Sequence, residues 1–249
     1  MYAFRTSLGP VDLAFTDRLG GVSDAPFDSL NLALVGDDDP GRRAENLRLV
    51  LADFAPGGLL ADLHQVHGAE VVDADPDADP DTDPDIDPDT GRPRCDGVVT
   101  DHPGVVLMVR AADCVPVLLA DAEAAVVGAA HAGRQGLAAG IVPATVARMR
   151  QRGARQITAW IGPHVCGACY EVPAPMRDEV GARVPQAVDS TSWGTPSLDL
   201  GAGVRAQLEA DGVGVVEAGG CTRESADLYS YRRDGVAAGR QAGLVWVRP

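Results

Sequence analysis

VVLMVRAADCVPVLLADAEAAVVGAAHAG, residues 105–133, is the most strongly patterned segment of the 249-residue chain. It holds three apolar runs, at 105–111, 115–121 and 124–133, which polar or acidic residues separate. Runs that are apolar at nearly every position are typical of strands buried on both faces, whereas strands with one wetted face alternate. The segment therefore predicts neighbouring strands at the centre of the fold.

Strand and helix patterns alternate on both sides of this segment. A helix is expected after it, from the spacing of Leu137, Ile141, Val142, Val146 and Met149. The fold class is therefore mixed α and β, with helices covering a sheet or a pair of sheets. The other expected elements are two short strands around a Gly-Pro turn within 2–18, helices at 41–54, 174–184 and 200–212, and strands at 156–162, 213–218 and 243–247.

The composition is that of a globular protein, with 45% hydrophobic and 23% charged residues. All 21 cationic side chains are arginines, so the chain has no lysine. This excludes enzymes that form a Schiff base with a lysine amine, and phosphate-loop NTPases of the usual kind. The formal charge of −15, without any basic run, argues against a nucleic-acid partner.

Two observations bear on the cellular location. No apolar run is long enough to span a bilayer and the first ten residues lack a secretory apolar core, so we expect no membrane partner. The five cysteines are an odd number and fit a reducing compartment better than a disulfide framework. We therefore expect a cytoplasmic monomer with a single domain that spans residues 1–249.

One segment departs from the rest of the chain. From Asp73 to Asp89 an aspartate stands at every second position, and prolines recur every four residues. Proline disfavours helix, and like charges extend the chain. We expect a disordered acidic insertion at about 73–93. A calcium loop is the alternative, but the glycine turn and final glutamate of that motif are missing.

Four residues of metal-ligand type stand at the ends of expected strands: His64 and His67 in LHQVHG, Cys114 in RAADCVPVLL, and His131 in GAAHAGRQG. A hairpin would bring Cys114 and His131 together, and either His64 or His67 would complete a set of three. Two histidines and one thiolate with an open fourth position are typical of catalytic zinc. From the residues alone, a packing cysteine and histidines bonded to the backbone explain the pattern equally well.

Two nearby features carry competing interpretations. Cys166 and Cys169 form a C-x-x-C pair, which we interpret as packing because Cys95 and Cys221 are solitary and no second pair exists. A second metal or a redox role is the alternative. Asp113, beside Cys114, either orients a ligand histidine or caps its strand.

Any anionic substrate must be held by arginine, because the chain offers no other permanent cation. The guanidinium group binds phosphate through two parallel hydrogen bonds. Solvated surface residues are the alternative for each candidate. The candidates stand beside polar turns and are Arg18, Arg134, Arg232 and Arg233.

The order of short motifs along almost the entire chain resembles the laccase-domain proteins, also called the multicopper polyphenol oxidase family. The motifs are GGVS (20–23), SLNL (29–32), GDD (36–38), QVHG (65–68), ADC-x-P (112–116), HAG (131–133), IGP (161–163), CYEV (169–172), CT (221–222) and S-x-RR (230–233).

The resemblance implies a fold and an activity. The fold would be mixed sheets sandwiched between helices, α/β/β/α in four layers, built from a repeated β-α-β-β unit. The activity would be zinc-dependent purine nucleoside phosphorylase, acting with phosphate on adenosine, inosine, guanosine or methylthioadenosine, together with adenosine deaminase activity. Carried over by motif, the metal ligands are His67, Cys114 and His131, which selects His67 over His64.

Two departures from the family pattern stand out. The family commonly has a tryptophan and a basic residue after HAG, where this chain has Arg134 and Gln135. The acidic insertion also lengthens the connection between His67 and Cys114. His64 remains a candidate for the acid that protonates the leaving base.

Three other functions compete with phosphorolysis. Copper-dependent phenol oxidation needs many histidines, and the chain has five. A cysteine hydrolase would use Cys114 as nucleophile and His131 as base. In a non-catalytic module, the metal would only stabilise the fold.

Overall fold

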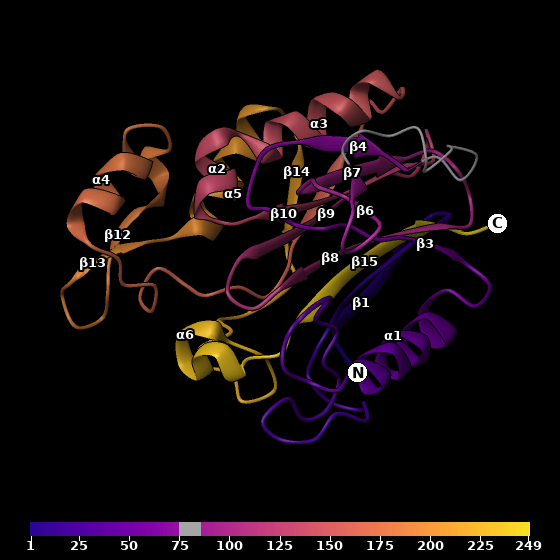
Figure 1. Cartoon of the computed structure of the whole chain (residues 1–249). Helices are drawn as coiled ribbons and strands as arrows, with labels where there is room; N and C mark the ends of the chain where they lie inside the picture. Colours follow the sequence, from indigo (N-terminus) through magenta and orange to yellow (C-terminus); the bar gives the residue numbers. More distant parts are fainter. Residues whose placement is uncertain (75–85) are drawn as a thin grey trace.

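Two β-sheets lie face to face, and helices cover their outer sides (Figure 1). The computed structural model describes residues 1–74 and 86–249. One helix, α1 (Pro40–Phe54), lies below the sheets in Figure 1, and three, α2 (Arg134–Ala139), α3 (Ile141–Gln151) and α5 (Leu200–Ala210), lie above them. The expected α/β/β/α layering is confirmed.

The first sheet has five strands in the order β1-β2-β15-β8-β3. β1 and β2 form the hairpin expected around Gly9 and Pro10, and β3 pairs in parallel with β8. The other pairs in the sheet are antiparallel. The strands are β1 (Tyr2–Leu8), β2 (Val11–Thr16), β15 (Gln241–Val247), β8 (Val105–Ala111) and β3 (Leu59–Ala61).

The second sheet has six strands in the order β14-β11-β9-β10-β7-β4. β9 and β10 form an antiparallel hairpin, and the Asp121 carboxylate stabilises its turn by accepting the N–H groups of Glu123 and Ala124. β8 and β9 follow each other in sequence but belong to different sheets, so residues 112–114 cross between the two sheets. The strands are β14 (Gly214–Glu217), β11 (Thr158–Ile161), β9 (Val115–Asp121), β10 (Val126–Ala132), β7 (Gly97–Thr100) and β4 (Val71–Asp73).

The apolar runs of the central segment are explained by three clusters of buried side chains. Leu107 of β8 and Leu118 of β9 lie in the cluster between the sheets. Their neighbours point the other way, Met108 toward α1 and Leu119 toward α3 and α5. Because both faces of each strand are buried, the strands are apolar except near one end, where Arg110 stands in β8 and Asp121 in β9.

The helices begin where the sequence supplies caps. The Asp39 side chain accepts the N–H of Arg42 at the start of α1, and the Asp199 side chain caps α5 in the same way. The single helix expected after the central segment is instead two, because Gly140 adopts a left-handed conformation (φ 89°) between α2 and α3. A further short helix, α6 (Tyr231–Asp234), is capped by the Ser230 side chain.

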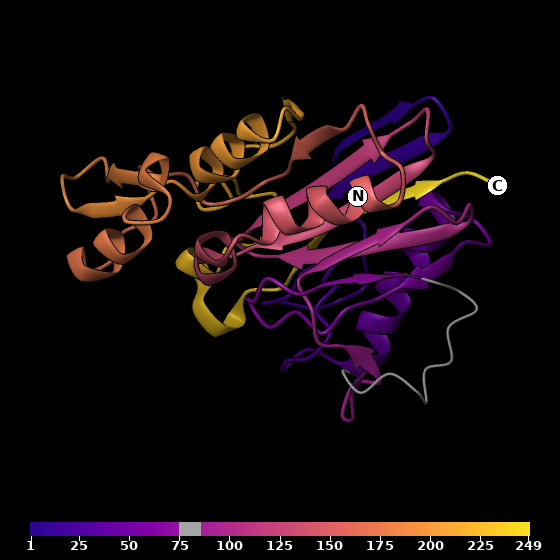
Figure 2. The ribbon, with the colours of Figure 1, turned by 90° about the horizontal axis from the view of Figure 1, so that it is seen from above.

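A small unit extends from one end of the molecule in both views (Figures 1 and 2). It consists of α4 (Ala174–Gly181), a short 3-10 helix at Pro185–Ala187, and the antiparallel pair β12 (Val188–Ser190) and β13 (Pro196–Leu198). A second 3-10 helix, Gly235–Ala237, follows α6. No helix in the described ranges combines the length and the apolar character needed to cross a membrane.

The two ends of the expected acidic insertion are described. Asp73 is the last residue of β4. Its carboxylate forms ion pairs with Arg148 of α3 (2.6 Å) and with Arg152, the residue directly after α3 (2.9 Å). At the other end, β5 (Ile86–Asp87) and β6 (Arg92–Pro93) form a small antiparallel pair. Residues 75–85 of the insertion lie outside the described residues.

Candidate metal centre

Three side chains from distant parts of the sequence converge at one end of the sheets. A nitrogen of His67, the sulfur of Cys114 and a nitrogen of His131 all lie within 4.8 Å of one another. His67 is exposed, Cys114 is half-buried and His131 is buried. We call this group the His-Cys cluster. It contains the three residues that the motifs indicated, and His64 is not part of it.

Strand pairing brings Cys114 and His131 together. Cys114 lies in the crossing between the sheets, directly before β9, and His131 stands opposite Pro116 in the β9–β10 register. The hairpin expected from the sequence is therefore what places the thiol beside the imidazole. Asp113, at φ 94°, turns the crossing so that β9 can start in the second sheet.

A buried carboxylate places His67, the third member of the cluster. Asp96 accepts the backbone N–H groups of Val66 (3.1 Å), His67 (3.0 Å) and Gly68 (2.7 Å), which holds His67 in a left-handed conformation at φ 62°. The Gln65 side chain fixes the start of this loop, because its amide donates to the Arg110 carbonyl and accepts the Arg110 N–H.

The same carboxylate also orients His131. Asp96 Oδ1 lies 2.8 Å from His131 Nδ1, which leaves Nε2 as the ring nitrogen available for a metal. Asp96 is fully buried, and its pKa stays below the usual range because His131 and the loop N–H groups outweigh the effect of burial. Asp96 was not among the residues expected from the sequence. It lies 29 residues along the chain from His67, whose N–H it binds, so no local motif connects the two residues.

The electrostatics of the cluster keep its sulfur ionised. Burial opposes ionisation of the Cys114 thiol, but the imidazoles of His131 and His67 outweigh it and lower the pKa to about 6. Burial likewise disfavours charge on His131, but the Cys114 thiolate and Asp96 raise its pKa to about 9. A thiolate at neutral pH is the state that metal coordination requires.

A glycine lets the backbone approach the cluster closely. A Cβ atom at Gly133 would lie 2.7 Å from His67 Cδ2 and 3.2 Å from Cys114 Sγ. Any larger residue would therefore displace His67 and Cys114. The glycine of the HAG motif thus allows the two side chains to lie close to the backbone.

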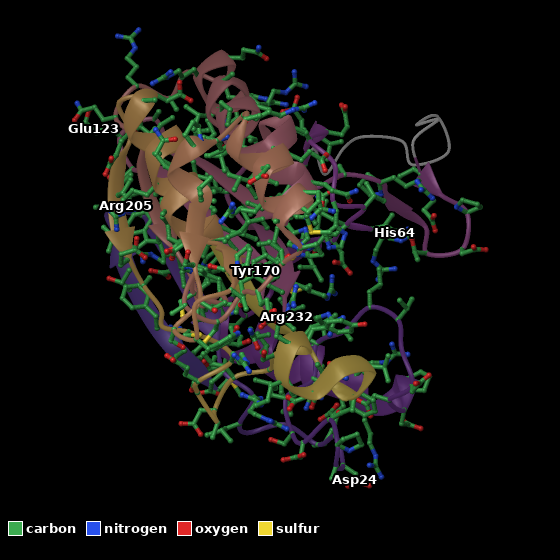
Figure 3. All side chains as sticks on the ribbon, turned by 90° about the vertical axis from the view of Figure 1, so that its left-hand side faces the viewer. Asp24, His64, Glu123, Tyr170, Arg205 and Arg232 are labelled. Atoms are coloured by element: carbon green, nitrogen blue, oxygen red, sulfur yellow. The ribbon has the colours of Figure 1, made fainter. Side chains whose placement is uncertain are left out.

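The His-Cys cluster opens into a cavity of about 710 Å³. This volume is within the usual range for a small-molecule site. Tyr170 and Arg232 lie together on one side of the opening, with His64 on the other side (Figure 3). The remaining lining residues are Ala33, Leu34, Val35, Leu63, Gln65, Arg110, Ala111, Ala112, Asp113, Tyr231 and Arg240.

Two arginines present charge to this cavity. Arg232 stacks on the Tyr170 ring at 4.5 Å. Arg240, which sequence reasoning missed, is anchored because its Nη1 donates to the carbonyls of Ala238 and Gly239. Burial lowers the pKa of Arg240, but arginine stays protonated in proteins. Arg110 also lines the cavity, but its guanidinium binds Asp62 and the Leu32 carbonyl.

The other arginine candidates lie elsewhere. Arg18 binds Asp28 and stacks on the Tyr229 ring at 4.7 Å. Arg233 donates to the carbonyls of four residues around 222–228 and pairs with Asp234, so it stabilises that loop. Arg134 begins α2 near Tyr170 but does not line the cavity.

Asp113 has neither of the roles considered for it. Its carboxylate accepts the Thr222 hydroxyl and the Arg232 backbone N–H, both at 2.6 Å. It therefore joins the crossing between the sheets to the segment that carries α6. His64, on the opposite wall, places Nδ1 3.0 Å from Asp87 Oδ2.

The chain is similar to one known family over almost its whole length. The multi-copper polyphenol oxidoreductase laccase family matches residues 12–248. A purine nucleoside phosphorylase of Streptomyces coelicolor is 47% identical, over 99% of this chain and 100% of that protein. One of Streptomyces griseus is 48% identical, over 96% and 95%.

Solved structures agree with these relatives. The crystal structure of YlmD from Geobacillus stearothermophilus has a TM-score of 0.83 and 30% identity, and the match covers all of both chains. A Neisseria meningitidis protein of family DUF152 has a TM-score of 0.83 and 33% identity, over 98% of this chain and 96% of that one. The fold of this chain is therefore shared with solved structures over almost the whole length of each chain.

Proposed function

The chain belongs to the multi-copper polyphenol oxidoreductase laccase family, and from this premise we propose that it is a zinc-dependent purine nucleoside phosphorylase. The reaction cleaves the N-glycosidic bond of a purine nucleoside with inorganic phosphate and yields the free base and ribose 1-phosphate. The observation that carries the proposal is the His-Cys cluster, with its three convergent ligand atoms, at the wall of a cavity that holds arginine charge. One domain, acting as a monomer, would hold the whole site.

The donor set of the His-Cys cluster fits zinc. Two imidazole nitrogens and one thiolate are ligands that Zn²⁺ prefers, and three protein ligands leave a fourth position for a reactant. When bound there, zinc supplies a Lewis acid that stabilises negative charge on an oxygen anion. Asp96 contributes by fixing the His131 tautomer and the His67 loop before any ligand binds.

Arg232 and Arg240 would hold the phosphate anion in the cavity. Both line the cavity, and the chain has no lysine that could compete for this role. Asp113 fixes the backbone of Arg232, while Ala238 and Gly239 fix one side of the Arg240 guanidinium. A guanidinium positioned in this way binds phosphate with little loss of side-chain freedom.

The purine would lie against the aromatic side of the cavity. Tyr170 and Tyr231 both line it. Tyr231 is half exposed, so its ring is available for stacking. His64 lines the cavity, and its imidazole would protonate the leaving base.

The test is a phosphate-dependent assay. Protein loaded with zinc is incubated with adenosine, inosine, guanosine or methylthioadenosine, with and without inorganic phosphate. We expect equal amounts of free purine and pentose 1-phosphate, and no base release when phosphate is omitted. The proposal would be contradicted if the base were released at the same rate without phosphate, or if none of the four nucleosides released its base. Inosine and ammonia formed from adenosine would report the adenosine deaminase activity that the family resemblance implies.

His64 is tested separately, because its role concerns one step. His64→Ala should lower the rate of phosphorolysis and change its pH profile, while zinc content stays the same. His102→Ala, a matched change at a histidine that does not line the cavity, should leave both unchanged. An unaltered rate and pH profile in His64→Ala would remove it from the mechanism.

A cysteine hydrolase remains the second candidate, because the pKa of Cys114 is lowered to about 6 next to His131. A thiolate of this kind is also a nucleophile. Alkylation with and without a chelator separates the two functions. A zinc ligand should resist alkylation until the metal is removed, whereas a hydrolase thiol should react at once and lose activity.

A further inference from the structure

A second group of ligand-type side chains lies outside the catalytic cavity. Cys166, Cys169, Cys221 and Glu224 each place a sulfur or carboxylate oxygen within 4.8 Å of the others. We call this group the thiol cluster. The C-x-x-C pair is therefore not isolated, because the fold brings a third cysteine to it from 52 residues further along the chain.

Backbone hydrogen bonds align the two segments that carry these residues. His164 N–H donates to the Gly220 carbonyl (3.3 Å), and Thr222 N–H donates to the His164 carbonyl (2.9 Å). The Cys166 N–H points at the Cys221 sulfur (3.4 Å), and the N–H groups of Cys169 and Tyr170 close a turn on the Cys166 carbonyl. These backbone hydrogen bonds therefore bring the three sulfurs close to one another.

The carboxylate of the thiol cluster is held against its sulfurs. The Cys169 sulfur lies 3.6 Å from Glu224 Oε1. Cys166 and Cys221 are half-buried, and Cys169 is buried. Three sulfurs and one carboxylate oxygen that converge in this way are all atoms that bind Zn²⁺.

We propose that the thiol cluster binds a second Zn²⁺, tetrahedrally coordinated by the three sulfurs and one Glu224 oxygen. With Zn–S bonds of about 2.3 Å, tetrahedral sulfurs lie about 3.8 Å apart, which the cluster reaches by small side-chain movements. Binding releases three thiol protons to solvent. Four anionic ligands around Zn²⁺ leave two negative charges, and the Arg223 guanidinium contacts Cys169 and offsets part of them.

This site is closed, in contrast to the His-Cys cluster, because all four ligands come from the protein. Its position explains what it stabilises. Thr222 follows Cys221 and donates to Asp113, beside the catalytic cysteine, while Tyr170 follows Cys169 and lines the cavity. The second zinc would therefore hold one wall of the cavity in place. The inference does not depend on which reaction the cavity catalyses.

The test is metal stoichiometry of the full chain, purified with reductant, loaded with Zn²⁺ and freed of excess metal. We expect two zinc ions per chain. Cys221→Ser should retain one, Cys114→Ser should retain one, and the double variant none. With Co²⁺ in place of Zn²⁺, Cys114→Ser should keep a sulfur-to-cobalt charge-transfer absorption that the double variant lacks.

Exposed Glu224 provides the variant that keeps the fold intact. Glu224→Gln should lose the second zinc to a competing chelator at least about 10-fold more readily. Glu209→Gln, at an exposed glutamate of α5, and Cys95→Ser, at a cysteine outside both clusters, should each retain two ions. One zinc in the unaltered chain, or a mass lower by two hydrogens that shows a Cys166, Cys169 or Cys221 disulfide under reducing purification, would overturn the proposal.

Discussion

The His-Cys cluster and the thiol cluster place sulfur in opposite electrostatic environments. At Cys114, two imidazoles overcome burial and lower the thiol pKa to about 6. At Cys166, burial and two neighbouring sulfurs raise it to about 12. Burial raises the thiol pKa at both positions, so the residue types next to each cysteine determine whether its sulfur is nevertheless ionised before a metal arrives.

The difference also separates the roles of the two clusters. Three ligands beside a cavity leave room for a reactant, whereas four ligands from two aligned segments leave none. The variants below alter one cluster at a time and ask whether the other responds.

The largest effect is expected from removing the catalytic thiolate. Cys114→Ser should abolish zinc binding at the His-Cys cluster and lower phosphorolysis about 10³-fold or more, because the metal supplies several kcal/mol of charge stabilisation. Steady-state rates with inosine, measured beside zinc content, check this. A Cys114→Ser protein with one zinc and near-normal turnover would place catalysis elsewhere.

Asp96→Asn should have the next largest effect. An amide cannot accept all the hydrogen bonds that the carboxylate takes from His131 and the loop at 66–68. We expect zinc affinity at the His-Cys cluster to fall about 10–100-fold. The free energy of unfolding should fall by about 1–3 kcal/mol, measured by urea titration.

Asp211, at the C-terminal end of α5, provides a control. It separates the loss of the hydrogen bonds that orient His131 and His67 from the mere loss of one negative charge. Asp211→Asn should change neither zinc affinity nor stability measurably. If Asp96→Asn instead weakened zinc binding at the thiol cluster, the independence of the two clusters would be lost.

Gly133→Ala tests how closely the backbone approaches the ligands. The added methyl group would lie 2.7 Å from His67 Cδ2, so the imidazole ring must shift from its present position. We expect zinc affinity to drop about 10-fold, by analogy with the loss of a partner that orients a ligand. Gly214→Ala, where the methyl group would have ordinary contacts, should bind zinc normally in the same chelator competition.

The smallest effect is a difference in thiol reactivity. In metal-free protein, thiolate at Cys114 increases as pH rises through about 6, because its pKa is lowered, whereas Cys166 stays protonated up to about pH 12. Iodoacetamide at neutral pH should therefore modify Cys114 well before Cys166, as peptide mass mapping would show. Faster labelling of Cys166 would contradict the electrostatic contrast.

Much of the fold is predictable from local pattern. The runs of 105–133 predict buried strands because each face of β8 and β9 contacts apolar neighbours, and the hairpin that joins Cys114 to His131 follows from chain order. The break in the helix at Gly140 was missed because glycine is tolerated in helical patterns, and only the backbone angle shows that the helix ends there.

The site is less predictable, because its parts meet through tertiary structure. His64 and His67 have the same residue type and similar neighbours, so only the motif, and then the geometry, separates them. Asp96, Arg240 and Cys221 belong to no local metal pattern, and each contacts its partners across the fold. Their roles depend on pairings between segments that periodicity does not encode.

The Asp96 carboxylate accepts hydrogen bonds from three consecutive backbone N–H groups, at residues 66–68. The left-handed turn at His67 is secured during folding, so the conformational entropy of arranging the ligands is lost before an ion arrives. The centre is therefore preorganised, and exchanging one divalent ion for another should leave the polypeptide path unaltered.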